Sequence, residues 1–567
     1  MKKTKLRRSK KWLALLTLPF VCTSFPVWAA TPPNSATALE GSKPPAIQQP
    51  VEKKGPVISV EGQEPPAGES GQVSFAVHSF RFSGDLPVPQ EELQSLVTGD
   101  TGKEITLSRL NELAGRITNH LRQKGYLVAF AYIPAQDIKD GVVTIAVVPG
   151  KYEEIQVKGS AHIRPERIKD MLFAASPGSI ITRESLERAL LLLNDISGLQ
   201  ASATLVPGKD AGTADLVVTA ADGAKVSGAF YGDNWGNRYT GETRTGITAT
   251  INNCTNTGDS FRLGGLLTEG QRLGDYDFGY SALLGNDGAR WSVSHSRVHY
   301  TLGEEFAAAG YSGRSVTTSY SVSYPLRRSR EFSLYGSAGY DVKHLKDAAA
   351  GNESPKNDGM WNLGLSGNFS DNWLGGGSNS FSLTHYRGKL DIEAAATAAY
   401  DASTAQSAGD FAKTVLDWHR QQAVARNLNF AFHFTGQTAN KNLDSSEKLF
   451  LGGADEVRAF PQGEASGDEG YLISGELQWL LPGLSDSKNT VSLAGFYDYG
   501  NVMVNKHPWA GAGNNRRSLM GAGLGIRWAH SREYALRLDY AWKIGDETAT
   551  SGSDKNGRLW LQGIRYF

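Results

Sequence analysis

The chain has 567 residues, and its 58 Lys and Arg balance 58 Asp and Glu. This length exceeds that of one ordinary domain and allows three or four. The balanced charge lacks the basic excess of a nucleic-acid-binding protein, so we expect no nucleic-acid partner.

The N-terminus predicts a secretory signal peptide over residues 1–29. A basic stretch, MKKTKLRRSKK, precedes the apolar WLALLTLPFVCTSFPVWA, and small residues place cleavage after Ala29. The apolar run is too short to span a bilayer as a helix. Its removal takes away seven basic residues, leaving seven more acids than bases and Cys254 as the only cysteine. The exported chain therefore cannot form an intramolecular disulfide.

Residues 30–72 are rich in Pro, Gly and polar side chains. This composition predicts a flexible linker that buries little apolar surface. A segment that threads into or plugs another domain is the alternative, but the proline content argues against a plug helix.

Residues 73–221 contain two copies of one β-α-α-β-β unit of about 75 residues, joined at Gly150. In the first copy, residues 74–82 (SFAVHSFRF) and 126–134 predict strands, and residues 107–125 predict a helix that Thr106 caps and Gly125 ends. We expect inner helix stripes in both copies: Leu110, Leu113, Ile117 and Leu121, then Leu186, Leu190 and Leu193. We place the unit boundaries at 73–150 and 151–221.

From residue 222 to Phe567 the chain alternates apolar and polar residues in strands separated by turns and unequal loops. In residues 534–542, tyrosine, leucine and tryptophan alternate with Ala535, Arg537 and Asp539. A soluble sandwich would alternate too, but unequal loops and aromatics at both ends of the apolar face favour a transmembrane barrel. At roughly 20 residues per strand and connection, about 16 antiparallel strands fit.

Two segments of this region organise the candidate site. Residues 447–479 open with a Gly-rich loop that carries Arg458 and close in a strand whose polar face includes Glu476. Residues 495–502 (GFYDYGNV) place Asp498 on the face opposite the apolar side chains. If the apolar sets meet lipid, Asp498 and Glu476 point into the lumen. Turn lengths put loop 436–470 outside the cell, as the sixth of eight external loops, so only inward folding brings Arg458 to Asp498.

Two motifs resemble a known family. Residues 125–159 resemble the polypeptide-transport-associated (POTRA) module of two-partner secretion transporters, with a turn at Pro134, Gln136 and Ile138 before Asp140 and Gly141. The barrel resembles the same transporters, the TpsB group of the BamA-like superfamily: VRAF, at residues 457–460, stands at the family's VRGY/F loop tip, and FYDYG, at residues 496–500, at its F-x-D-x-G strand. Ala459 departs from the family's usual glycine, which is tolerable if its φ is negative.

The resemblance implies a loop–barrel lock between Arg458 and Asp498. Supporting residues are Val457, Phe460, Phe496 and Gly500, with Glu476 as an alternative partner for Arg458. The bland alternative is a solvated loop arginine, whose ion pair contributes about 0–1 kcal/mol. The POTRA units are expected to bind an unfolded substrate along a strand edge or in a groove between helix and strand, and our candidate residues are Tyr126, Phe130, Tyr132, Pro134 and Gln136. The alternative is that the POTRA units are a spacer that only supports the barrel and binds no substrate.

The resemblance therefore implies an outer-membrane translocator with periplasmic POTRA domains. Its partners would be a large secreted exoprotein, outer-membrane lipid and the machinery that inserts barrels. Two other functions stay open: a barrel-assembly factor, which predicts more POTRA modules, and a passive porin with a periplasmic binding module, which predicts no inward Arg–Asp lock. The usual hydrolase and P-loop signatures are absent, and we expect no catalytic residue, metal or cofactor.

Overall fold

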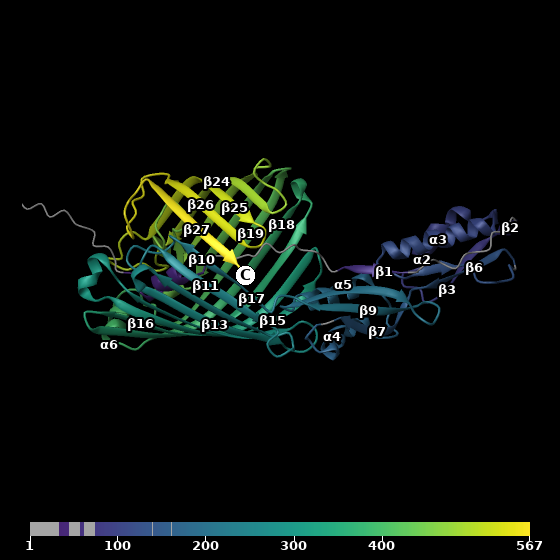
Figure 1. Cartoon of the computed structure of the whole chain (residues 1–567), viewed down its shortest axis with the longest axis horizontal. Helices are drawn as coiled ribbons and strands as arrows, with labels where there is room; N and C mark the ends of the chain where they lie inside the picture. The colour runs from purple at the N-terminus through teal and green to yellow at the C-terminus, as the bar shows by residue number, and fades with distance from the viewer. Residues whose placement is uncertain (1–32, 45–56, 62–73, 139, 160) are drawn as a thin grey trace, which may run out of the picture.

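The computed structural model describes residues 33–44, 57–61, 74–138, 140–159 and 161–567. The molecule is elongated, with a β-barrel at one end and two smaller lobes in line beyond it (Figure 1). The predicted signal peptide, residues 1–29, lies outside the described residues. Within the described part of the chain, no helix is long and apolar enough to cross a bilayer.

The barrel is closed, antiparallel and built from sixteen strands, which confirms the predicted fold class. Its strands, in barrel order, are β10 (Val226–Asp233), β11 (Arg244–Asn252), β12 (Ser260–Thr268), β13 (Leu273–Leu283), β14 (Arg290–Thr301), β15 (Ser312–Arg328), β16 (Phe332–Ala349), β17 (Asn352–Asp371), β18 (Gly377–Ile392), β19 (Gly409–Ala425), β20 (Leu428–Ala439), β23 (Glu469–Leu480), β24 (Asn489–Met503), β25 (Arg516–His530), β26 (Tyr534–Lys543) and β27 (Gly557–Tyr566). The ring closes where β10 pairs with β27 from Ala229↔Tyr566 to Asp233↔Gln562.

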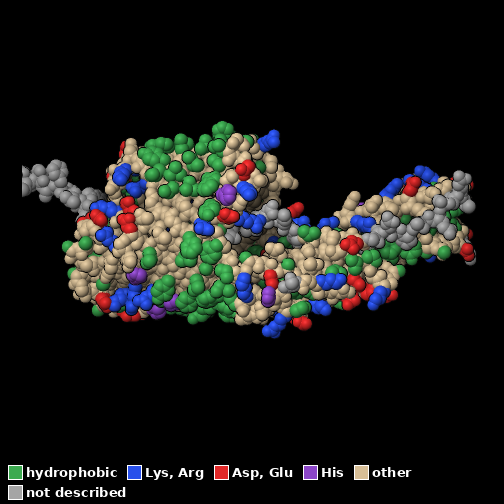
Figure 2. Space-filling model, in the orientation of Figure 1, with side chains coloured by type: hydrophobic (Ala, Val, Ile, Leu, Met, Phe, Trp, Pro, Cys, Tyr) green, Lys and Arg blue, Asp and Glu red, His purple; other side chains and the backbone are tan. Residues whose placement is uncertain are grey.

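The two faces of the wall follow the alternation in the sequence. Leu477 and Trp479 of β23 are 48% and 53% exposed on the outside, whereas Glu476 is 8% exposed inside. On β24, Tyr497 faces outward and Asp498 is fully buried. Figure 2 shows hydrophobic side chains gathered over the outer surface of the barrel. This outer belt fits a bilayer, because lipid stabilises apolar side chains there.

Connections between the strands alternate between the rim beside the two lobes and the opposite rim. Since β10 starts directly after the second lobe, the long connection at residues 440–468 lies at the far rim, as the sixth of eight there. Short helices stand in several connections: η3 (Glu269–Gln271), η4 (Glu304–Ala309), η5 (Trp373–Gly375), α6 (Ala395–Ser403) and η6 (Ser445–Glu447).

The distal lobe packs two helices against short sheets. It contains β2 (Ser74–Val77), β3 (Ser79–Gly84), α2 (Gln90–Val97), η1 (Thr98–Asp100), β4 (Lys103–Thr106), α3 (Leu107–Gln123), β5 (Phe130–Tyr132) and β6 (Val142–Val148). Thr106 caps α3 by accepting a hydrogen bond from the Arg109 N–H at 3.3 Å. The predicted stripe of α3 is completely buried in the lobe's core.

Two strand predictions in this lobe are wrong. Residues 74–82 form two strands, because the apolar phase changes at His78: Val77 is buried before it, and Phe80 and Phe82 after it. Strand β2 pairs with β4, while β3 runs parallel to β6 in another sheet. The strand expected at 126–134 is confined to β5, which pairs with β6 through three residues.

The lobe next to the barrel repeats the plan with β7 (Lys151–Gly159), α4 (Pro165–Met171), η2 (Phe173–Ala175), α5 (Arg183–Asn194), β8 (Leu199–Pro207) and β9 (Thr213–Asp222). Its predicted helix stripe, Leu186, Leu190 and Leu193, is fully buried. A strand from the linker, β1 (Ile58–Val60), pairs in parallel with β8 and covers that edge of the sheet.

The linker also contributes a helix inside the barrel, so the expectation that proline excludes a plug helix was wrong. Helix α1 (Ser35–Ser42) packs against β13, β14, β15 and β16. Its sequence, SATALEGS, holds no proline; Pro33 and Pro44 only flank it. The Asn34 side chain caps it by accepting hydrogen bonds from the N–H groups of Ala36 and Thr37 at 3.1 and 3.3 Å.

The lobe next to the barrel is fixed to the short turns of the near rim. Asp195, just after α5, accepts two hydrogen bonds from the Arg328 guanidinium, both at 2.7 Å. Arg188 donates to the Pro325 carbonyl at 3.1 Å. These contacts join α5 and the residue after it to the end of β15, beside the turn to β16.

Candidate functional site

The long connection at 440–468, which we call the inward loop, folds from the far rim into the lumen. A two-stranded hairpin, β21 (Leu449–Leu451) with β22 (Ala465–Gly467), carries its tip at residues 452–464. Gly452 and Gly453 have φ of +92° and +137°, where side chains are strained. A Cβ on Gly453 would lie 2.1 Å from the Gln462 side-chain oxygen. Glycine is therefore required at the entry to the tip.

Apolar side chains hold the tip against the wall. Val457 and Phe460 are completely buried, together with Leu451 from the hairpin. Their wall partners are Leu472, Phe496, Val502, Leu519 and Ala541. A Cβ on Gly500 would lie 2.8 Å from a methyl of Leu451 and 3.2 Å from one of Val457, so the glycine of FYDYG leaves room for the tip.

Arg458 lies at the centre of these contacts with 3% of its surface exposed. Its Nε and Nη2 each donate to Asp498 at 2.8 Å, and its backbone N–H donates to the same carboxylate at 3.2 Å. The guanidinium carbon lies 3.3 Å from the centre of the Phe496 ring. A planar guanidinium suits this place because it binds a carboxylate in two parallel hydrogen bonds and stacks on an aromatic face.

Glu476 contacts Arg458 at the same time as Asp498. It accepts from Nη1 of Arg458 at 2.6 Å, while Ser474 accepts from Nη2 at 3.3 Å. The sequence offered Glu476 as an alternative partner, whereas the structure places both carboxylates around one guanidinium. The pair is therefore part of a larger cluster.

Three lumen residues that the sequence analysis did not select extend this cluster. Asp539 is completely buried and accepts from Arg527 at 2.5 Å and from Arg537 at 2.8 Å. Arg527 also donates to both oxygens of Glu476, at 3.1 and 2.9 Å. The Nη1 of Arg458 lies 3.6 Å from Asp539. The phase of strand 534–542 already placed Arg537 and Asp539 on the lumen face, which is the signal that could have found them.

The closing strand of the barrel touches the tip directly. The Trp560 indole N–H donates to the Arg458 carbonyl at 2.7 Å. This hydrogen bond joins β27 to the residue that β24 holds by its side chain. The tip therefore contacts β27, which closes the ring against β10, as well as β24.

Ala459, where the family usually has glycine, fits without backbone strain. It is not among the described residues with positive φ, so the condition for tolerating its Cβ is met. Room for that Cβ comes from Gly521, where an added Cβ would lie 2.5 Å from the Ala459 Cβ.

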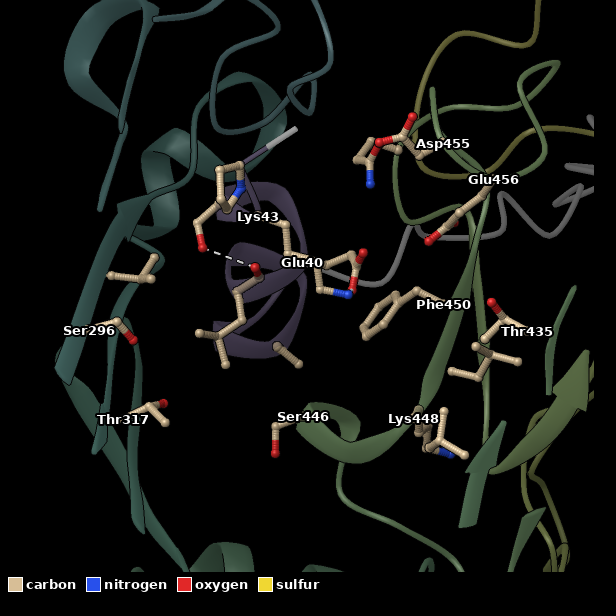
Figure 3. Close-up of a pocket in the computed structure, with 18 of the residues that line it drawn as sticks. Glu40, Lys43, Ser296, Thr317, Thr435, Ser446, Lys448, Phe450, Asp455 and Glu456 are labelled. Atoms are coloured by element: carbon tan, nitrogen blue, oxygen red, sulfur yellow. Dashed lines mark hydrogen bonds and ion pairs between the residues drawn. The ribbon is translucent and has the colours of Figure 1, made fainter. Parts of the chain in front are cut away.

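Helix α1 occupies the lumen opposite the tip. Asp347 of β16 accepts from the Ser35 N–H at 2.7 Å and from the Tyr300 hydroxyl at 2.6 Å. Arg244 donates to the Gly41 carbonyl at 2.7 Å, near the C-terminal end of the helix. Figure 3 shows Glu40 and Lys43 of the helix across from Asp455 and Glu456 of the tip, around a cavity of about 870 Å³.

The candidate substrate-binding residues of the distal lobe differ in exposure and in the contacts that they make. Phe130 and Tyr132 lie on β5, which ends its sheet, with ring centres 6.0 Å apart, and Tyr132 is 37% exposed. Tyr126 instead donates to the Pro87 carbonyl at 2.7 Å. Gln136 bonds the N–H and C=O of Thr144 at 2.7 and 2.8 Å, in the turn after Pro134. On β5 the Ala131 N–H donates to Thr118 of α3 at 2.9 Å, so the strand leaves the Tyr132 side chain accessible, while Tyr126 and Gln136 make structural contacts.

Comparison with known families decides the assignment. The model of the haemolysin secretion/activation protein family ShlB/FhaC/HecB matches residues 212–528, and the ShlB-type POTRA domain matches residues 75–150. The chain belongs to this family. It is therefore an outer-membrane translocator of the two-partner secretion type, with its POTRA domains in the periplasm.

Curated relatives agree with this assignment. The chain is 29% identical over 485 residues to the heme/hemopexin transporter protein HuxB of Haemophilus influenzae, covering 85% of each chain. It is 23% identical over 478 residues to the outer membrane transporter CdiB of Dickeya dadantii, covering 83% of each. Both relatives are transporters.

Solved structures share the fold. CdiB from Escherichia coli superposes with a TM-score of 0.72 at 19% identity, covering 89% of this chain and 93% of that one. BamA from Haemophilus ducreyi, lacking POTRA domains 1–3, superposes with a TM-score of 0.53 at 15% identity, covering 87% and 100%.

Proposed function

We propose that the distal POTRA unit captures an unfolded exoprotein and that the barrel exports it once the inward loop and α1 leave their present places. The observation that carries this proposal is the buried Arg458 guanidinium, held by Asp498 and Glu476 at 2.6–2.8 Å. A porin needs no such cluster, since its lumen conducts small solutes without moving a loop. The chain acts as a transporter, and we assign it no catalytic residue or cofactor.

In this proposal, the Arg458–Asp498 lock sets the position of the inward loop. Asp498 is completely buried, so removing Arg458 leaves an unpaired carboxylate. Breaking a buried ion pair in this way costs about 3–5 kcal/mol. Glu476 and Asp539 would lose a cationic neighbour as well. The loop would then lose its defined place against β24.

We predict that Arg458→Ala leaves the barrel inserted but abolishes secretion. The candidate exoprotein is co-expressed with each variant, secretion is measured in the medium, and insertion is measured by the heat-dependent mobility of the barrel. Arg262→Ala is the matched control, because Arg262 lines the same lumen with its side chain 51% exposed and its nearest carboxylate at 3.7 Å. Normal secretion by Arg458→Ala would refute the lock.

For capture, we propose that an extended segment of the exoprotein binds beside β5, against Phe130 and Tyr132. Exposed aromatic side chains anchor extended peptides, and they carry the contact here because the Ala131 N–H of β5 is already bonded to Thr118. The second POTRA unit leaves less of strand β8 free to bind substrate, because β1 of the linker already pairs there. The distal unit is thus the better first contact.

Tyr132→Ala is expected to lower secretion roughly 5- to 30-fold, because losing an aromatic anchor removes about 1–2 kcal/mol of binding. The matched control is Tyr400→Ala, since Tyr400 is 69% exposed on α6 at the far rim. Secretion equal to wild type with Tyr132→Ala would contradict capture at this edge and favour a spacer.

The other partners follow from the surfaces. The similarity to a heme/hemopexin transporter makes a haem- or hemopexin-binding exoprotein the first cargo to test. We further propose that lipid covers the apolar belt and that barrel-assembly machinery inserts the chain through its C-terminal strand.

We propose that the chain is divided into a signal peptide at 1–29, a linker with plug helix at 30–72, POTRA units at 73–150 and 151–221, and the barrel at 222–567. If depletion of the protein lowered the levels of unrelated outer-membrane barrels, the assembly-factor alternative would replace this proposal.

A further inference from the structure

A second cluster of chemically active side chains lies on the lumen wall, apart from the Arg458 cluster. Asp417 and His419 stand two residues apart on β19, and His433 stands opposite His419 on β20. Strand alternation places all three on one face. The atoms by which they could ligate a metal ion, two imidazole nitrogens and a carboxylate oxygen, lie within 4.8 Å of one another. This is the one such group of three or more His, Cys, Asp or Glu residues among the residues described.

One carboxylate serves both imidazoles. The Nε2 of His419 lies 2.9 Å from one oxygen of Asp417, and the Nε2 of His433 lies 3.0 Å from the other. The two rings stack with centres 4.0 Å apart and planes at 9°. Each imidazole therefore directs its Nε2 toward the same carboxylate, which is a place where a proton or a metal ion can be shared.

The surroundings support a cation at that point. The Thr435 hydroxyl donates to Asp417 at 2.7 Å and fixes the carboxylate. Such a second contact is typical of ligating carboxylates. His419 and His433 also line a cavity of about 260 Å³ with Glu456 of the inward loop. One oxygen of Glu456 is buried and has no hydrogen-bond partner among the described residues. The arginines of this cavity are already paired with carboxylates.

We propose that Asp417, His419 and His433 form a binding site for a late first-row divalent metal ion, with Zn²⁺ as the probe. Two imidazole nitrogens and one carboxylate oxygen are a ligand set that suits Zn²⁺. Bond lengths of about 2.0–2.2 Å put neighbouring ligand atoms roughly 3.3 Å apart in a tetrahedral site. The 2.9 and 3.0 Å contacts are close to that spacing, so binding requires the protons to leave and the stacked rings to open slightly.

The fourth position faces the cavity shared with the tip of the inward loop. A bound ion would place positive charge between the wall and the acidic pair Asp455 and Glu456, both of which line that cavity. The ion would then stabilise the inward position of the loop. Metal binding is linked to stability in this way because the ion binds the folded state and not the unfolded chain.

The test is titration of the purified full-length protein in detergent with ZnCl₂ at neutral pH, followed by calorimetry. We expect one ion per chain. His419→Ala and His433→Ala should each weaken binding roughly tenfold or more, because even outer-shell changes weaken metal sites by 10- to 100-fold. His419 is the safer variant for folding, since its side chain is 53% exposed. The matched control is His385→Ala, whose imidazole contacts Thr414 on the same β19 strand and should bind like wild type.

Two further readouts separate a built site from adventitious binding. Co²⁺ should give the intense visible absorption of a four-coordinate site in wild type and in His385→Ala but not in His433→Ala. Zn²⁺ should raise the unfolding temperature of the same two proteins only. The proposal is overturned if wild type binds no Zn²⁺, or if the cluster variants bind it as tightly as wild type.

Discussion

At the scale of single residues, the lumen holds two kinds of contact that the tip of the inward loop depends on. One is charged: the Arg458 guanidinium meets Asp498 and Glu476 at 2.6–2.8 Å. The other is steric: Gly500 and Gly521 leave space that the side chains of Val457 and Ala459 fill. The two glycines lie on strands of the wall, and the two side chains lie on the loop. A substitution that fills the space on the wall can therefore be compensated by a smaller side chain on the loop.

Gly521→Ala tests the steric contact. Its Cβ would lie 2.5 Å from that of Ala459, so overpacking of about 1–3 kcal/mol should displace the tip and reduce secretion. Ala459→Gly removes the atom that clashes, leaving the Trp542 carbonyl at 3.1 Å as the nearest contact. We therefore expect the double variant to regain part of the secretion, measured in the same co-expression assay. A double variant as impaired as Gly521→Ala would show that the clash lies elsewhere.

Residue alternation predicts which side chains face the lumen but not which ones meet. The sequence placed Asp498, Glu476, Arg537 and Asp539 on polar faces, and the structure has all four inside. Strand register decides that Glu476 and Asp539 share Arg527, and period-two patterns carry no register between strands. For the same reason, Asp417 and His433, sixteen positions apart, gave no metal motif in the sequence.

At the scale of elements, α1 and the inward loop fill the lumen from opposite ends of the chain. The helix has few apolar side chains and hydrogen-bonds to the wall mainly through Ser35 and the Gly41 carbonyl. Its sequence lacks the apolar stripe that identified α3 and α5, so pattern alone could not find it. Such polar docking to a wet lumen suits a reversible plug, because little apolar burial holds the helix in place.

Asp347→Ala tests this docking. The change removes the acceptor for the Ser35 N–H and hydroxyl and for Tyr300, so α1 should leave the lumen more often. We expect a higher open fraction in single-channel conductance across planar bilayers. Asp341→Ala is the control, since Asp341 lies on the same strand but contacts Asn362 rather than the helix. Equal conductance in both variants would mean that Asp347 does not hold α1.

At the scale of the whole molecule, contacts join the periplasmic lobe next to the barrel to the plug helix α1. The distal lobe exposes Tyr132 on β5, and the linker, whose helix α1 lies in the barrel, pairs further along the chain with β8 through β1. The lobe next to the barrel holds Arg328 at the end of β15, and Arg328 also donates to Ser333 of β16 at 3.0 Å. Strand β16 carries Asp347, which binds α1. Substrate contact in the periplasm can therefore reach the plug through β1 or through β16.

The second route depends on the ion pair between Asp195 and Arg328. Both hydrogen bonds are 2.7 Å long, and the side chains are 35% and 17% exposed, so water screens the pair only in part. Asp195→Arg and Arg328→Asp should each place like charges at this contact, loosen the lobe and lower secretion. The exchanged double variant restores opposite charges and should recover secretion, with a coupling of about 1 kcal/mol in the unfolding free energy. If both single variants secrete normally, the lobe does not signal through this turn, and the linker strand β1 is the route that remains.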